Sequence, residues 1–309
     1  MFGFWKNIFA KDANSRLFGD VVDDTTTRVM KRLAGADNAR QRKLPDNVIA
    51  FIGAAGGVGT STILNNTAYA LARNNLSVLI CDLNTLYPSV QNFYRPQTPL
   101  PDLVDFLVGK VAAGGAIKHI TSELSVLCAH NRTLFDLLFA DTEKTAEHWG
   151  ATLEKLSELY DIVMIDLPNH LELELVGETI HRCDRLYIVW NEDVKCPAQT
   201  ERLRYCAEDG VGAYINAKSR IIINKRTGIY YTNEPIEKLG IRMCTEAFPY
   251  DAKVLESGLF SEIFIEKGSG TSYTAKMFEK RVYELAQALL DDASGVRGMV
   301  GVNQEKVIE

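Results

Sequence analysis

Several features that would assign a chain to a common functional class are scarce or missing here. Basic residues are in the minority, because 34 lysines and arginines against 40 aspartates and glutamates give a formal net charge of −6. This balance argues against nucleic acid as a partner. The six cysteines include no C-x-x-C pair and no close histidine–cysteine cluster. We therefore expect reduced, mostly buried thiols, and not a zinc or iron–sulfur site.

Long hydrophobic runs are also missing. No stretch of the sequence reaches the roughly 18 apolar residues that a membrane-spanning helix requires. Hydrophobic residues nevertheless make up 46% of the 309 positions, which is enough to fill one large core. We expect a cytoplasmic protein built around one main domain.

The most informative absence is that of a lysine from a glycine-rich stretch. Residues 51–62 read FIGAAGGVGTST, with glycines at positions 56, 57 and 59. Such a turn lets successive backbone N–H groups point at one anion, and a helix that begins near Thr60 adds the positive end of its dipole. Ser61 stands where a hydroxyl would coordinate Mg²⁺. A strand-to-helix turn that binds nothing would look similar, so this stretch alone does not establish a nucleotide site.

The pattern around this stretch predicts the fold. Apolar runs without polar alternation are typical of parallel strands that are covered on both faces. They span residues 47–54, 77–83, 124–129, 160–168, 185–190 and 219–226. Apolar residues at helical spacing follow at residues 60–74, 146–160, 197–210 and 275–292. This alternation predicts an α/β fold with a doubly covered, mostly parallel sheet.

Polar residues stand at the ends of several predicted strands. Asp82 ends one strand, and Asp166 ends another just before Pro168, as an acid that holds Mg²⁺ through water would. Asn224 ends a third strand, where it can hydrogen-bond a base, and the sequence FPYD at residues 248–251 can pack on an adenine ring. Each has a simpler interpretation, since an aspartate at a strand end often only caps a helix. Their order along the chain makes coincidence a poor explanation.

The glycine loop and these motifs, in this order, resemble the MinD/ParA family of deviant Walker ATPases. The sequence GAAGGVGTST is most similar to the loop of the TadZ/CpaE branch, the pilus-assembly and polar-localisation ATPases. The resemblance covers about residues 47–290. It implies a P-loop NTPase fold, ATP and Mg²⁺ as cofactors, and a homodimer formed around the nucleotide.

The resemblance also implies which residues form the site. Those expected to bind the cofactor are Ala55, Gly56, Gly57, Val58, Gly59, Thr60, Ser61, Thr62, Asn224, Lys225, Pro249 and Asp251. The metal would be held by Ser61 and Asp166. Asp82 and Asn84 occupy the positions of the family's two catalytic acids.

Three positions depart from the family pattern. Ala55 replaces the signature lysine that reaches a partner's nucleotide, and Thr60 replaces the lysine that bridges the β- and γ-phosphates. Asn84 replaces an acid that helps to place the attacking water. Losing one such charged stabiliser typically costs about 10²–10³-fold in rate, so we expect binding with slow or absent turnover. Lys195 is either a replacement cation or an ordinary surface lysine.

The N-terminal segment is rich in aromatic residues. On a helical wheel the large apolar side chains share one arc of about 160°, opposite the lysines. They are Phe2, Phe4, Trp5, Ile8 and Phe9. This pattern predicts a helix in a membrane interface, although a helix docked on the protein itself or on a partner subunit would fit equally well. The predicted organisation is this helix at residues 1–12, a polar linker with helix at 13–46, the P-loop domain at 47–292 and a flexible tail at 293–309.

These observations favour a cytoplasmic ATP-binding protein that attaches to the inner face of a membrane. It would act as a localisation or assembly factor for a membrane-associated machine, with pilus or secretion proteins as partners. Two alternatives stay open: a ParA-like DNA-partitioning ATPase, which would carry a basic DNA-binding face, and a nucleotide-free scaffold. A redox reductase of the same superfamily is disfavoured because paired cysteine ligands are missing from the sequence.

Overall fold

The computed structural model describes residues 46–85, 87–96, 100–130, 142–170, 173–205, 216–228, 234–245, 247–268 and 272–293. Within them, eight strands form one sheet in the order β3-β4-β2-β5-β1-β6-β7-β8. The strands are β1 (Val48–Gly53), β2 (Val78–Asp82), β3 (Lys118–His119), β4 (Leu124–Cys128), β5 (Ile162–Leu167), β6 (Arg185–Trp190), β7 (Ser219–Ile223) and β8 (Arg242–Met243). Neighbours pair in parallel except β3 with β4. The predicted α/β fold with a mostly parallel sheet is therefore confirmed.

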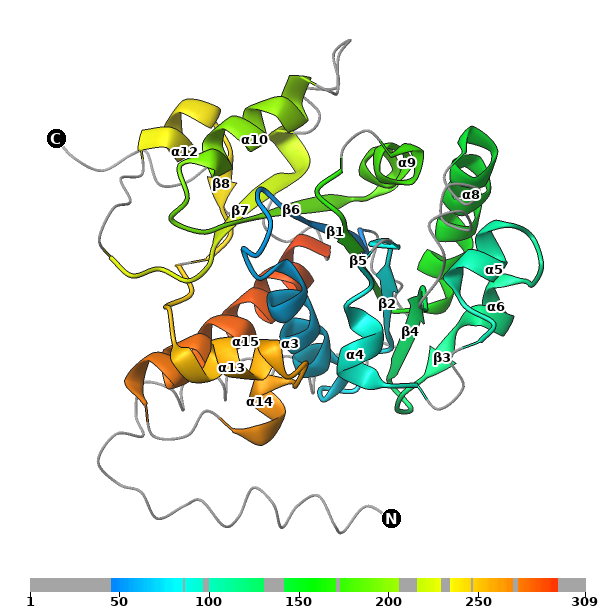
Figure 1. Ribbon diagram of the computed structural model, residues 1–309, viewed down its shortest axis with the longest axis horizontal. Coiled ribbons are helices and arrows are strands. Elements are labelled where there is room, and N and C mark those ends of the chain that lie inside the picture. The colour runs from blue at the N-terminus through cyan, green and yellow to red at the C-terminus, as the bar shows by residue number, and fades with distance from the viewer. Residues whose placement is uncertain are drawn as a thin grey trace, which may run out of the picture.

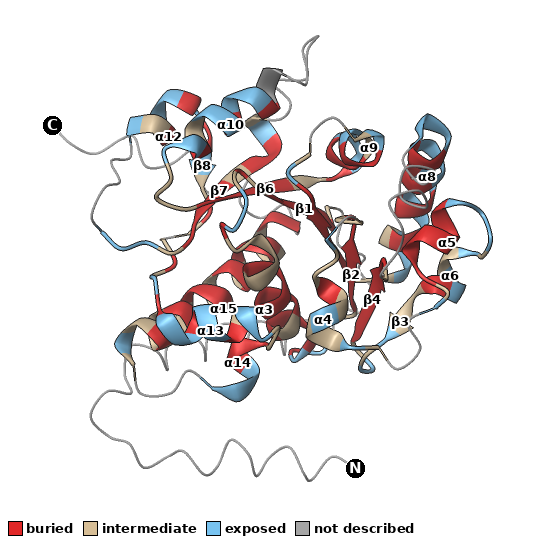
Figure 2. Ribbon diagram, viewed as in Figure 1, coloured by how far each residue is buried: buried red, intermediate tan, exposed pale blue. Residues whose placement is uncertain are grey.

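Both faces of the sheet are covered, which is why its six longer strands are mostly apolar. Every residue of β2, β4 and β5 is buried. Figure 2 shows the sheet as a buried layer, with the exposed residues on the outer sides of the helices. The six longer strands could be predicted from their continuous apolar runs. Strands β3 and β8 have two residues each and leave no such signal.

Helices lie on the two faces of this sheet (Figure 1). One face carries α3 (Thr60–Ala72), α4 (Val90–Tyr94), α13 (Ala252–Leu259), α14 (Phe264–Lys267) and α15 (Tyr273–Ala293). The other carries α8 (Glu143–Leu159), α9 (Glu174–Arg182), α10 (Lys195–Tyr205) and α12 (Glu234–Leu239). Short helices α5 (Leu103–Leu107) and α6 (Ala113–Ala116) lie beside α8 at the β3–β4 edge.

Helix α15 fastens the C-terminal part of the described chain to the sheet. The Tyr187 hydroxyl of β6 donates a hydrogen bond of 2.8 Å to the Asp292 carboxylate near the end of α15. The Phe278 ring of α15 makes edge contacts with Phe248 and Phe264. These rings hold the segment that follows β8 against α15. As a result, residues 248–251 are placed beside the ends of the strands.

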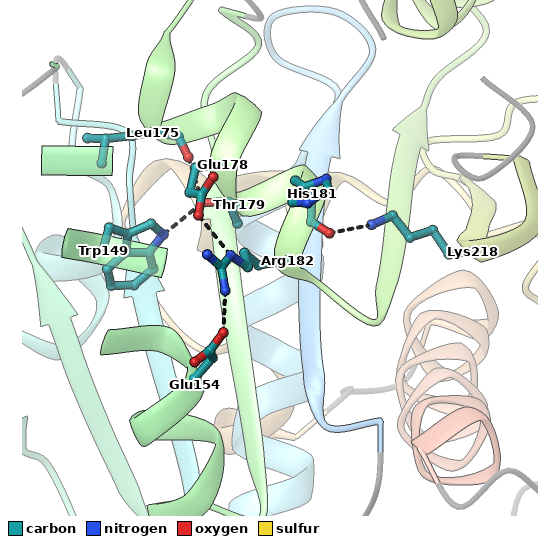
Figure 3. Close-up of polar contacts among 8 residues, drawn as sticks. All are labelled: Trp149, Glu154, Leu175, Glu178, Thr179, His181, Arg182 and Lys218. Carbon is teal, nitrogen blue, oxygen red and sulfur yellow. Dashed lines mark hydrogen bonds and ion pairs between the residues drawn. The ribbon is translucent and has the colours of Figure 1, made fainter. Parts of the chain in front are cut away.

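Helices α8 and α9 are joined by a polar network that Figure 3 displays. The indole N–H of buried Trp149 on α8 donates to the Thr179 hydroxyl of α9 at 2.8 Å. The Arg182 guanidinium donates to the Glu178 carboxylate at 2.8 Å and also to Glu154 of α8. The indole bond is buried and directional, whereas exposed ion pairs contribute little to stability. The Trp149 contact therefore sets how these two helices pack.

A buried lysine, Lys218, caps the C-terminal end of helix α9. The Lys218 ammonium donates to the carbonyl oxygens of Ile180, His181 at 3.4 Å and Cys183 at 3.0 Å, and Figure 3 shows it directed at His181. The last carbonyl groups of a helix have no partner inside the helix. Lys218 supplies donors to them from the residue that precedes β7, and so it couples α9 to the sheet.

The predicted element boundaries are wrong in a few places. The strand expected at residues 219–226 ends at Ile223, because Lys225 takes a left-handed conformation with φ 56°. The helix expected at 197–210 begins earlier, at Lys195. The N-terminal helix at residues 1–12, most of the linker at 13–46 and residues 294–309 of the tail lie outside the described residues. None of the described helices combines the length and the hydropathy that crossing a membrane would require.

Candidate functional site

The candidate site lies at the carboxyl ends of the parallel strands. The loop between β1 and α3 opens into a cavity of about 370 Å³. It is lined by loop residues 55–62 together with Asn84, Asp166, Asn224, Lys225, Pro249 and Asp251. Open α/β sheets bind ligands outside the carboxyl ends of their strands. The structure therefore brings all the sequence-predicted site residues to one cavity except Asp82, which lies behind it.

The loop forms an anion cradle at the start of α3. Gly57 and Gly59 have φ of 75° and 93°, a region that glycine adopts without strain. Gly59 is the N-cap of α3, and this fully described helix has no side-chain cap and no acidic residue in its first turn. The N–H groups at the helix start, with the positive end of its dipole, are thus available to an anion. Phosphate is the ligand type that such a loop fits.

Asn224 holds the loop from the neighbouring part of the sheet. Its side-chain amide donates to the Val58 carbonyl at 2.8 Å, and the residue is almost completely buried. A Cβ atom added to Gly59 would lie 2.4 Å from the same amide nitrogen. A side chain at position 59 is therefore disfavoured both by the positive φ and by the close approach of the Asn224 amide. The predicted contact of Asn224 with a base stays a prediction, since in this structure its amide serves Val58.

Ser61 and Asp166 form an oxygen-rich corner on the floor of the cavity. The Ser61 hydroxyl donates to the Asp166 carboxylate at 2.5 Å, and Ser89 donates to the same carboxylate oxygen at 3.4 Å. Asp166 lies directly across from Asp82 in the β2–β5 register. Burial, and then the nearby Asp82 charge, raise the pKa of Asp166 to about 8, against the lowering effect of the two hydroxyl bonds. A positive charge placed at this corner would favour the ionised form of Asp166.

The Asp82 side chain organises the loop that follows β2. Its carboxylate accepts backbone N–H bonds from Asn84 at 3.0 Å, Ser89 at 2.8 Å and Val90 at 2.9 Å. Burial raises its pKa above the ordinary range, and these three bonds partly offset the increase. The contacts favour an anchoring role for Asp82, while Asn84 and Ser89 face the cavity. A catalytic role for Asp82 and Asn84 stays a prediction.

The donor set at this corner fits a magnesium ion. Mg²⁺ prefers hard oxygen ligands and usually combines one or two carboxylates with phosphate oxygens and water. Ser61 Oγ and Asp166 Oδ2 are already adjacent, and burial and the neighbouring Asp82 charge disfavour the ionised form of Asp166, which a bound cation would stabilise. Ser61 and Asp166 are therefore suited to hold the ion, and their role as metal ligands stays a prediction.

The far wall of the cavity comes from the FPYD segment. Pro249 and Tyr250 line it, and the Tyr250 side chain is partly exposed. The Asp251 carboxylate caps α13 by accepting from the Lys253 and Val254 amides, and it also accepts from the Ser272 hydroxyl. The Asp251 carboxylate thus has a structural role, and it fixes the turn at residues 248–251 that forms this wall of the cavity.

How two lysines lie relative to the cavity could not be predicted from the sequence. Lys195, considered as a replacement cation, is exposed at the start of α10 and does not line the cavity, so a role within its own chain is not supported. Lys225, which had no stated role beyond cofactor binding, reaches the loop, and its ammonium donates to the Gly57 carbonyl at 2.6 Å. No sequence signal marks this contact, because it depends on the left-handed conformation at Lys225.

The apolar rim of the site, formed by Leu255, Leu259 and Phe260, could not be predicted from the sequence. Helix α13 contributes Leu255 and Leu259 to the cavity lining, and Leu259 is 76% exposed. The next residue, Phe260, is 60% exposed. The sequence AKVLESGL could have indicated a short helix after the Asp251 cap, but it gives no indication that its leucines meet the glycine loop.

Comparisons with known proteins agree with this architecture. Residues 46–194 match the AAA_31 family, described as an AAA domain. No curated protein sequence matches the chain significantly. The fold is that of the MinD/ParA-type P-loop ATPases, as solved structures with 17–19% identity demonstrate.

Three of these structures illustrate the likeness. The cell division ATPase MinD from Pyrococcus furiosus has 19% identity and a TM-score of 0.64, over 78% of this chain and 99% of that one. A ParA family ATPase from Chlorobium tepidum has 19% identity and a TM-score of 0.61, over 81% and 98%. The septum site-determining protein MinD from Pyrococcus horikoshii, solved with Mg-ADP, has 17% identity and a TM-score of 0.62, over 84% and 99%.

Proposed function

We propose that the cavity binds Mg·ATP and that the protein acts as a nucleotide-dependent dimerising factor. The observation that carries this proposal is the convergence of three features in one cavity. They are the uncapped start of α3 behind two left-handed glycines, the Ser61–Asp166 oxygen pair, and the turn at residues 248–251. The first suits phosphates, the second Mg²⁺, and the third a flat base. The Mg-ADP bound to the P. horikoshii MinD supports the assignment by likeness of fold.

The bound metal would neutralise phosphate charge, and the protein would position it. Loop amides at residues 56–62 would hold the β-phosphate, and the Ser61 and Asp166 oxygens would hold the ion. Asp82 keeps Asn84 and Ser89 at the cavity wall by binding their amides. Without lysines at positions 55 and 60, hydrolysis would be slow, so the nucleotide-bound state is the working state.

The dimer is supported by the surface beside the cavity. Leu255, Leu259 and Phe260 expose apolar side chains around its opening, next to Tyr250 at 44% exposure. Clustered exposed apolar residues on a soluble protein mark an interaction surface. A second copy docked here would cover both the apolar rim and the nucleotide.

A role of the TadZ/CpaE type, in which the dimer localises or helps to assemble a membrane-associated machine such as a pilus, is the finer part of the proposal. Its support is the loop sequence GAAGGVGTST and the predicted N-terminal membrane helix. One alternative, DNA partitioning, is suggested by the likeness of fold to a putative plasmid partition protein from Borrelia burgdorferi, which has 15% identity and a TM-score of 0.60. Salt-sensitive DNA binding would favour that alternative, because phosphate contacts are lost as salt rises.

The mass of the protein in solution tests the dimer. Light scattering on the full chain should report a doubling of mass with Mg·ATP. Leu259→Glu should abolish the doubling, because it places a charge in the proposed contact. Leu159→Glu is the matched control, since Leu159 is 72% exposed, does not line the cavity, and ends α8 just before the amino end of β5. An unchanged mass in the wild type at saturating Mg·ATP would exclude the dimer.

A further inference from the structure

The cavity contains acidic groups but little positive charge. Asp166 and Asp251 line it, whereas Lys225 is the one lysine or arginine among the described residues of its lining. Phosphate-binding loops ordinarily add a cation that reaches the β- and γ-phosphates. In this chain the loop itself contains no basic residue between positions 51 and 62.

The Lys225 side chain lies against the glycine loop. Its Nζ atom is 2.6 Å from the Gly57 carbonyl oxygen, to which it donates. Its Cε atom would lie 3.6 Å from a Cβ atom added to Gly59. The lysine thus spans the two left-handed glycines of the cradle from the β7 side. A rotation about the bonds of its flexible stem would move the ammonium from the carbonyl to an anion in the cradle.

The backbone that carries Lys225 is fixed on both sides. The Asn224 side chain donates to Val58 at 2.8 Å, and the Arg226 amide donates to Phe248 at 2.9 Å. Beyond it, the Glu192 carboxylate accepts from the backbone amide of Thr227 at 3.0 Å. The left-handed conformation of Lys225 costs free energy for a residue with a Cβ atom. A strained residue persists where its surroundings over-determine it, so the backbone of Lys225 is held in place, and only its side chain would need to rotate to redirect the ammonium.

The present partner of the ammonium is a neutral carbonyl oxygen. The side chain is half-buried, and this burial lowers the pKa of the Lys225 amine. An anion beside it would stabilise the charged form, and a charge-assisted bond to phosphate is stronger than one to a neutral carbonyl. The Lys225 ammonium is therefore hydrogen-bonded to a neutral group, and an anion would be a stronger partner for it.

We infer that Lys225 is the phosphate-directed cation of this site, acting within one chain in place of a lysine in the loop. The inference rests on the proposed nucleotide binding. It assigns Lys225 to the terminal phosphates, so its contribution should grow with the number of phosphates on the ligand. Two other roles predict different behaviour: a latch that only fixes the loop through Gly57, and a contact with the base.

The test compares ligands with different numbers of phosphates. Equilibrium titrations of the full chain would use Mg·ATP, Mg·ADP, adenosine and tripolyphosphate. Lys225→Met removes the charge and keeps the apolar stem, and Lys225→Arg keeps the charge. Lys253→Met is the matched control, because Lys253 is an exposed lysine on α13 that does not line the cavity.

Lys225→Met should weaken Mg·ATP and tripolyphosphate about 10- to 100-fold, as loss of a charged hydrogen bond does. It should weaken Mg·ADP less and adenosine less than about 2-fold. Lys225→Arg and Lys253→Met should bind Mg·ATP like the wild type within a few-fold. The slope of affinity against salt should be smaller in Lys225→Met.

Four results would overturn the inference. Unchanged Mg·ATP affinity in Lys225→Met would exclude a phosphate role. An equal loss for adenosine and Mg·ATP would indicate a base contact, and an equal loss for every ligand together with a lower Tm of the free protein would indicate a latch. A wild type that binds neither Mg·ATP nor tripolyphosphate would overturn the proposed function, and the inference with it.

Discussion

At the scale of single residues, the site depends on loop positions where glycine is required because a side chain would not fit. Gly59 is the sharpest case, because its φ of 93° and the Asn224 amide nitrogen both exclude a side chain. Gly56 is different, since a Cβ atom there would meet nothing within 4 Å and its φ is not positive. Neighbouring glycines of one loop therefore have unequal requirements.

This difference predicts unequal effects of two alanine substitutions. Gly59→Ala should destabilise the protein by roughly 1–3 kcal/mol, because the new Cβ must either strain the backbone or displace Asn224 from Val58. Gly56→Ala should change stability by less than about 0.5 kcal/mol. Urea unfolding of the free proteins measures both. Equal stability of the two variants would contradict the described approach of Asn224 to the loop.

The Asp166 carboxyl predicts how the stability of the free protein depends on pH. Its pKa is raised to about 8 in the folded protein, whereas an unfolded aspartate ionises near pH 4. Between these values the folded state binds a proton that the unfolded chain has released, so this group's contribution is full below about pH 4 and is lost as pH rises through about 8. Asp166→Asn should flatten that part of the decline.

Urea unfolding of the wild type and Asp166→Asn from pH 5 to pH 8.5 provides the check. The comparison reports Asp166 together with the part of the Asp82 titration that depends on its charge, while the remaining carboxyl groups are shared by both proteins. Parallel stability profiles would show that Asp166 titrates alike in the folded and unfolded states.

At the scale of helices and strands, most of the framework followed from the sequence. Buried parallel strands are apolar at most positions, so their runs could be recognised without any tertiary information. Helices α3 and α15 likewise begin and end within two residues of the expected 60–74 and 275–292. The predicted ends failed where one residue changes the backbone direction, as Lys225 does after β7.

Parts of the site could not be predicted because they depend on long-range contacts. The Lys225–Gly57 and Asn224–Val58 bonds join residues that lie more than 160 positions apart. Helix α13 has eight residues and packs beside the loop only because α15 holds the segment before it. The loop motif was visible as a local pattern, whereas the cation that faces it was not.

The C-terminal end of α9 yields a prediction at this scale. Lys218→Met keeps the buried stem and removes the ammonium that serves the last carbonyl groups of the helix. We expect a loss of about 1–3 kcal/mol, since buried carbonyl groups would lose their donor. Thermal or urea unfolding measures it.

Lys155→Met on the exposed side of α8 is the control for this experiment, and it should be close to neutral. A Lys218→Met variant as stable as this control would show that solvent or other groups replace the ammonium at no cost.

At the scale of the whole molecule, we propose that the N-terminal segment links nucleotide binding to membrane attachment. The amphipathic helix formed by the five large apolar residues between positions 2 and 9 remains a sequence prediction, because this segment lies outside the described residues. One short amphipathic helix binds weakly and reversibly, and two linked copies can raise apparent affinity by about 10²–10⁴. Dimerisation driven by Mg·ATP would therefore strengthen membrane attachment.

Co-sedimentation with phosphatidylethanolamine–phosphatidylglycerol vesicles tests this link. The wild type should pellet more with Mg·ATP than without it, and Trp5→Glu or a chain without residues 1–12 should stay in solution. Trp5→Phe, which keeps an aromatic side chain, should pellet like the wild type. Pelleting that needs the segment but ignores Mg·ATP would retain the anchor and reject the switch.

Nucleotide binding is the claim on which the others depend, and calorimetric titration of the full chain with Mg·ATP measures it most directly. Saturable binding at one site per chain is expected in the wild type and in Gly177→Glu, whose side chain would lie in open space on α9. Gly56→Glu places a carboxylate in the cradle and should weaken binding at least about 10-fold, since like charges repel in a confined site. The absence of saturable binding at millimolar Mg·ATP, or equal binding by Gly56→Glu and Gly177→Glu, would contradict the assignment of this cavity.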